Sequence, residues 1–194
     1  MNNAVPGFWP ITLKSIVVHT ITYFAMGILA FTLFDYRTNY ADPSLSMLMR
    51  QTDDPWVMAG PAFQPIRGFL FGVAFYLLRS SLFGRKYGWL TLWAVLVIVG
   101  ILSTFGPTPG SIEGLLYTVI PVPLQVMGLP EVVGQALLLA ALLCYWVDHP
   151  ERRWLTWLLV VAFFIVMAFP FLGLWATAQG LAPSCARRSH GFAG

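Results

Sequence analysis

Residues 11–34 read ITLKSIVVHTITYFAMGILAFTLF, an apolar run in which Lys14 carries the single formal charge. A helix that crosses the roughly 30 Å hydrocarbon core of a bilayer needs about 20 predominantly apolar residues. The run is therefore long enough to span a membrane as one helix. No small-x-small cleavage signal follows it, so we expect a retained helix and not a signal peptide.

Four later runs of the same kind predict four further membrane-spanning helices. They cover residues 61–78, 87–105, 130–147 and 154–175. The chain is 58% hydrophobic and only 10% charged, whereas a water-soluble domain needs far more charge to cover its surface. We therefore predict an all-α integral membrane protein with five transmembrane helices, forming a single domain over residues 1–194 that ends in a polar tail, 176–194.

Basic residues predict the orientation of these helices, because lysine and arginine prefer short cytoplasmic loops. The loops after the second and fourth runs contain Arg79, Arg85, Lys86, Arg152 and Arg153. We therefore expect a cytoplasmic N-terminus and an outward-facing C-terminus, although two arginines in the tail oppose this assignment. A bacterial cytoplasmic membrane is the default location, since no organelle-targeting pattern precedes the first run.

Two segments outside the runs show helical character at lengths that are too short to span. The stretch 43–50 begins with an Asp42-Pro43 start signal and predicts a helix lying on the membrane surface. The stretch 111–127 follows a Pro/Gly-rich turn and contains two further prolines. It predicts a re-entrant or interfacial segment on the outer side, because irregular backbone at membrane depth is tolerated only against protein or a cavity.

Small residues recur along the second run. Gly60, Gly68 and Gly72 share one helical stripe with Gln64, at intervals of four or eight residues. Such a stripe allows another helix to approach closely. We favour packing against a helix of the same chain over a dimer interface.

Arg67 is the most informative single residue, since a guanidinium inside an apolar helix costs free energy unless it pairs or reaches water. Glu113, in the segment 111–127, is the partner that we expect for a structural ion pair. The alternative is a binding site for an anion or a lipid headgroup on the outer side. Its candidate residues are Gln64, Arg67, Glu113 and Tyr117.

His19 and Tyr23 are candidate buried polar residues on one face of the first helix. His149 and His190 lie at other depths, so we expect a hydrogen-bonded histidine and neither a haem ligand nor a metal site. We predict no cofactor, no metal and no nucleic-acid partner. Catalytic signatures such as Gly-x-Ser-x-Gly or His-Glu-x-x-His are absent from the sequence.

The sequence leaves two classes of function open. The first is a non-catalytic membrane component, such as an accessory subunit held by lipids and by a partner membrane protein or a second copy of the chain. The second is a small-molecule or lipid carrier, or a lipid-modifying enzyme, that uses an outer polar cavity around Arg67 and Glu113. We expect the first class and expect the protein not to be an enzyme.

Overall fold

The computed structural model describes residues 6–47, 49–52 and 54–179, and this part of the chain forms helices and connecting turns without a strand. Each predicted apolar run contains a helix. The long helices are α1 (Phe8–Leu33), α5 (Gly60–Leu77), α7 (Gly88–Val97), α10 (Leu129–Asp148) and α11 (Arg153–Ala178). The short ones are α2 (Tyr36–Tyr40), α3 (Pro43–Ser46), α4 (Pro55–Met58), α6 (Arg79–Leu82), α8 (Ile112–Tyr117) and α9 (Val122–Met127), with a π-helix at Ile98–Leu102.

Within the described residues, three helical stretches are long and apolar enough to cross a membrane: Phe8–Leu33, Val122–Asp148 and Arg153–Gly173. The predicted all-α fold is confirmed for the described residues, and the three stretches support the prediction of a membrane protein. The stretch Gly88–Leu102 is apolar but shorter. In α5 the polar residues Gln64 and Arg67 lower the hydropathy, so length and composition alone do not identify it as a span.

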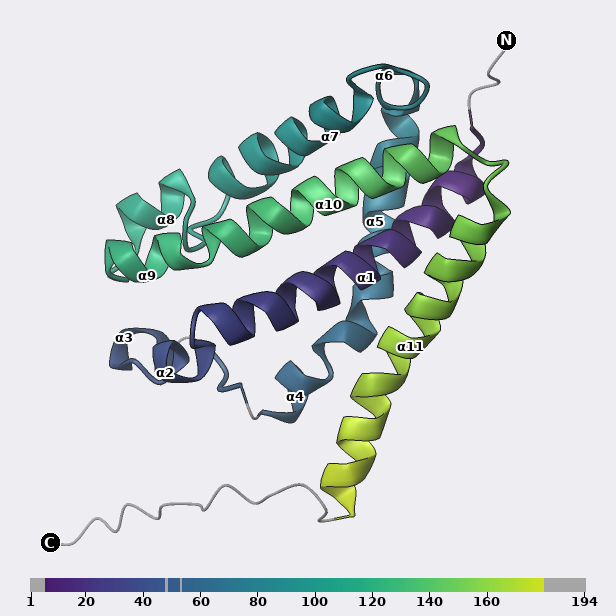
Figure 1. Ribbon diagram of the computed structural model, residues 1–194. Coiled ribbons are helices and arrows are strands. Elements are labelled where there is room, and N and C mark those ends of the chain that lie inside the picture. Colours follow the sequence, from purple (N-terminus) through teal and green to yellow (C-terminus); the bar gives the residue numbers. More distant parts are fainter. Residues whose placement is uncertain (1–5, 48, 53, 180–194) are drawn as a thin grey trace, which may run out of the picture.

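Helix α1 lies at the centre of the bundle, in contact with α5, α10 and α11 (Figure 1). Helix α10 packs on α1 and also on α7, so that α1, α10 and α7 lie side by side in Figure 1, with α5 crossing behind them. Their shared core is apolar. Its most buried members include Ile11, Val18, Leu92, Leu139 and Leu143.

One end of the bundle is held together by polar contacts between the ends of helices. The Lys14 ammonium donates a hydrogen bond of 2.7 Å to the carbonyl of Trp146, in the last turn of α10. A cation at this position satisfies a free carbonyl and complements the negative end of the helix dipole. The Trp146 indole N–H donates in turn to the Thr156 hydroxyl of α11 at 2.9 Å, and the Gly84 N–H donates to Asp148 at 2.8 Å.

The short elements differ from their predictions in extent. The helix expected at 43–50 ends at Ser46, and residue 48 lies outside the described residues. Within 111–127 the structure has two short helices, α8 and α9, separated by extended backbone at Thr118. Helix α9 passes through Gly128 straight into α10, and the fourth apolar helix therefore begins well before residue 130. The tail from residue 180 onward lies outside the described residues.

The glycine stripe of α5 lies against α1 within the same chain. A Cβ added at Gly68 would be 2.7 Å from the Cα of Ile16, and one added at Gly72 would be 2.6 Å from the Cα of Thr12. Both distances are far below van der Waals contact, so only glycine permits this separation of the two backbones. Gly60 is less constrained, since its nearest neighbour is the Tyr23 hydroxyl at 3.7 Å.

This close approach predicts that Gly68→Ala and Gly72→Ala each push α1 and α5 apart and destabilise the fold. We expect a loss of about 1–3 kcal/mol, as for other overpacked interiors, measured as a lower melting temperature in detergent. Gly128→Ala is the matched control, because nothing lies within 4 Å of a Cβ built there. Equal melting temperatures for all three variants and the wild type would contradict the packing.

Candidate functional site

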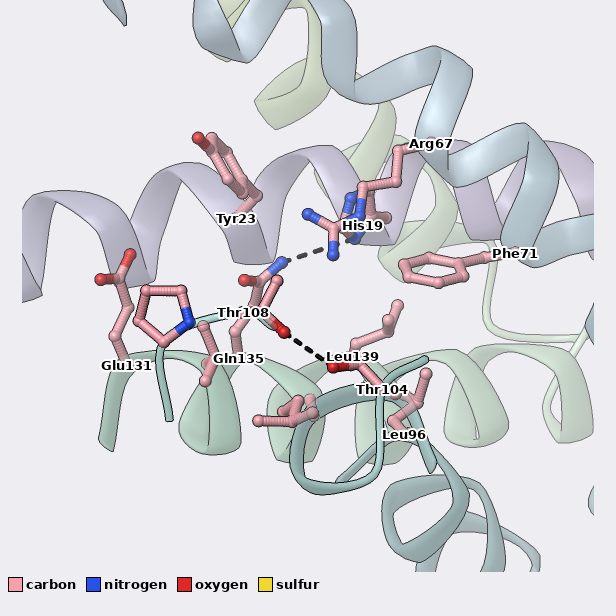
Figure 2. Close-up of a pocket in the computed structure, with 15 residues that line it drawn as sticks. His19, Tyr23, Arg67, Phe71, Leu96, Thr104, Thr108, Glu131, Gln135 and Leu139 are labelled. Atoms are coloured by element: carbon pink, nitrogen blue, oxygen red, sulfur yellow. Dashed lines mark hydrogen bonds between the residues drawn. The ribbon is translucent and has the colours of Figure 1, made fainter. Parts of the chain in front are cut away.

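A cavity of about 310 Å³ lies between α1, α5, α10 and the segment that follows α7 (Figure 2). Its polar lining consists of His19, Tyr23, Arg67, Thr104, Thr108, Glu131 and Gln135. Its apolar lining includes Phe71, Leu96, Ile101, Val132, Ala136 and Leu139. Concave, mostly apolar spaces with a few convergent polar groups are typical of small-molecule sites.

His19 anchors one side of the cavity through hydrogen bonds to two other helices. Its side chain is buried, its Nε2 lies 3.1 Å from Gln64 Oε1 and its Nδ1 lies 3.5 Å from Gln135 Nε2. The Gln64 amide donates onward to the Gly60 carbonyl at 3.2 Å. A neutral imidazole with its proton on Nε2 satisfies all three contacts. This network therefore fixes α5 and α10 to α1 without adding a charge.

Arg67 supplies the positive charge of the cavity. Its guanidinium extends from α5 toward His19 and Gln135 (Figure 2) and lies 5.5 Å from the centre of the Phe71 ring, a cation–π contact. Within the described part of the chain it has no hydrogen bond or ion pair. An arginine keeps its charge at any physiological pH. The guanidinium is thus a fixed cation that faces the cavity with its donors free.

Glu131 lies toward the opposite end of the cavity from Arg67 (Figure 2). Its carboxylate accepts a hydrogen bond from the Tyr36 hydroxyl of α2. Burial raises the pKa of Tyr36, and the bond to Glu131 raises it further, so the phenol remains a neutral donor.

Asp35, just before α2, has a left-handed backbone (φ 45°) that turns the chain at the end of α1.

The wall opposite α1 is made where the helix after Gly88 loses its regular form. A π-helix at Ile98–Leu102 leads into an irregular turn, in which the hydroxyls of Thr104 and Thr108 lie 2.7 Å apart. The Thr104 hydroxyl also bonds to the Gly106 carbonyl at 2.9 Å. Short π-helical segments are frequent at functional sites. The two threonines thus place hydroxyl groups on this wall of the cavity.

The structure brings together some of the residues that the sequence singled out and separates others. Arg67, His19 and Tyr23 line the cavity, whereas Gln64 does not line it but bonds to His19. Tyr117 is 73% exposed and does not line it. Glu113 does not line it either.

The expected ion pair between Arg67 and Glu113 is not formed. Helix α8, which carries Glu113, lies beside α9 beyond the end of α7, whereas α5 lies behind α1 (Figure 1). Among the described residues the ion pair within 4.0 Å is Arg50–Asp54, at 3.0 Å. The prediction failed because both charges were placed on the outer side without knowledge of which helices lie between them.

Sequence reasoning missed Glu131 and Gln135 as members of the site. A signal was available, since the two residues are four apart in an otherwise apolar helix and therefore share a face. That face is the one that α10 presents to His19. The described residues contain no group of three His, Cys, Asp or Glu side chains that could hold a metal ion.

Comparisons with known proteins do not suggest a function for the chain, so the geometry of the cavity is the basis for assigning one. No protein-family model, curated protein or solved structure matches the chain.

Proposed function

We propose that the chain is a multi-pass membrane protein in which α1, α5, α7, α10 and α11 all cross the bilayer. Both helices that fall short by composition or length contribute to the lining of the cavity. Arg67 lowers the hydropathy of α5 but faces the cavity, and the helix that begins at Gly88 gives way to the irregular turn that lines it. Polar side chains and irregular backbone are tolerated at membrane depth in such places. Helix α8 and the extended backbone after it form the re-entrant or interfacial element that the sequence predicts within 111–127, and α9 leads from it into α10.

The proposed orientation places the N-terminus in the cytoplasm, by default that of a bacterium. The support is a set of basic side chains over aromatic rings near one end of the bundle. Arg79 lies 4.1 Å from the Tyr76 ring, Lys86 5.3 Å from the Tyr87 ring and Arg152 5.3 Å from the Tyr145 ring. Aromatic rings and cations of this kind sit at lipid headgroups, on the cytoplasmic side where positive charge gathers.

This topology predicts which positions a membrane-impermeant maleimide reaches in intact cells. With Cys144 and Cys185 replaced by serine, a cysteine at Ser46 should be labelled from outside, whereas one at Lys86 should be labelled only after lysis. The opposite pattern would reverse the orientation, and labelling of both positions from outside would contradict the five crossings.

The function that the geometry supports best is binding or carriage of a small molecule in the cavity. The observation that carries this proposal is the Arg67 guanidinium, which faces an apolar-walled cavity and has no partner in the described protein. The Arg67 residue is exposed in the structure, and a guanidinium at membrane depth costs free energy unless it pairs or reaches water. A bound anion that pairs with Arg67 at the cavity would satisfy its donors.

Purification from native membranes in a mild detergent, followed by mass spectrometry of bound molecules, tests this function. We expect a small molecule that is retained in near-stoichiometric amount by the wild type. In Arg67→Gln its amount should fall about tenfold or more, since a charge-assisted hydrogen bond contributes about 1.5–3 kcal/mol.

Arg50→Gln is the matched control, because Arg50 carries the same charge but pairs with Asp54 on the surface. It should retain the small molecule at the wild-type level. If no small molecule copurifies and a protein partner is present in stoichiometric amount, the proposal fails. The alternative, a non-catalytic subunit of a larger membrane complex, would then replace it.

A further inference from the structure

The charges that line the cavity restrict the chemistry of its ligand. The lining contains one guanidinium, of Arg67, and one carboxylate, of Glu131. His19 adds no charge, because its two ring nitrogens are engaged by Gln64 and Gln135 in a way that a neutral ring satisfies. The ligand group at Arg67 is therefore an anion, and the Arg67 guanidinium is the cation in the lining that neutralises it.

From this arrangement we infer that the ligand is an amphiphilic monocarboxylate, with its carboxylate on Arg67 and its apolar chain along the walls of the cavity. This inference rests on the proposed function and names its ligand class. A planar guanidinium presents parallel N–H donors that match the two oxygens of a carboxylate. Pairing the two leaves no net charge at that end of the cavity.

A phosphate headgroup fits the same arrangement poorly. Its second negative charge would have no cation among the lining residues and would share the cavity with the Glu131 carboxylate. The Tyr36 hydroxyl already donates to Glu131, so the acid is fixed in place at the end away from Arg67. Arg67 can neutralise one negative charge of a ligand, whereas the second charge of a dianion would be repelled by the Glu131 carboxylate with no cation to offset it, so the cavity favours a monoanion.

The remaining walls and the volume define the rest of the ligand. Beyond Arg67, the cavity is bordered by Phe71, Leu96 and Leu139 and by smaller aliphatic side chains. At about 30 Å³ for each water-sized group, a volume of about 310 Å³ holds about ten such groups. An unbranched carboxylate of about eight carbons would fill this volume.

Binding of three eight-carbon probes to the protein in phosphatidylcholine nanodiscs tests this inference. The probes are octanoate, the uncharged 1-octanol, and octyl phosphate at pH 8, where a phosphate monoester is mostly dianionic. The protein is washed extensively in detergent before reconstitution, and its eight tryptophans report the melting temperature. We expect octanoate to raise the melting temperature of the wild type and of Arg50→Gln, with little effect from the other two probes.

Arg67→Gln should require at least about tenfold more octanoate for the same rise. If that variant does not fold, Arg67→Lys, which keeps the charge but loses the planar fork, should bind octanoate more weakly than the wild type and should still show little effect of octyl phosphate. Equal effects of octanoate and octanol, or a stronger effect of octyl phosphate, would overturn the inference.

The inference and the proposed function fail in different ways. A native ligand that is lost in Arg67→Gln but is not a carboxylate would refute the inference and leave the proposed function standing. If no native small molecule is retained and no probe protects the wild type, both are wrong.

Discussion

The contact between α1 and α5 is the constraint on which the site depends. Gly68 and Gly72 bring the backbone of α5 so close to Ile16 and Thr12 that a Cβ would overlap them. One turn earlier on the same face, Gln64 then meets His19. A wider separation of the helices would break this buried hydrogen bond and move Arg67 away from the imidazole. The glycines therefore position polar groups as well as pack helices.

Several polar groups of this apolar bundle converge on one cavity. The His19 network joins three helices, and Tyr36 joins α2 to Glu131 on α10. Each of these contacts satisfies a group that would otherwise be costly to remove from water. Arg67 is the exception, because its guanidinium faces the cavity with only the Phe71 ring against it. The proposed ligand would give Arg67 the polar partner that His19 and Glu131 already have within the protein.

Much of the fold could be predicted from the sequence, because apolar runs of the right length form helices whatever their neighbours. The importance of Gln64 and Arg67 was also visible, as polar residues in an apolar run. The pairing of Arg67 with Glu113 was wrong, because it depends on where α8 lies, and no local pattern determines that. Glu131 was missed, since its place in the cavity follows from the docking of α10 on α1. Local chemistry is thus readable from sequence, whereas the convergence of distant helices is not.

An experimental structure of the protein purified in a mild detergent tests the central claim most directly, through the density at Arg67. We predict an elongated density in the cavity between α1, α5 and α10, with one end within hydrogen-bonding distance of the guanidinium. The claim is contradicted if the cavity is closed or empty and Arg67 forms an ion pair with a carboxylate of its own chain.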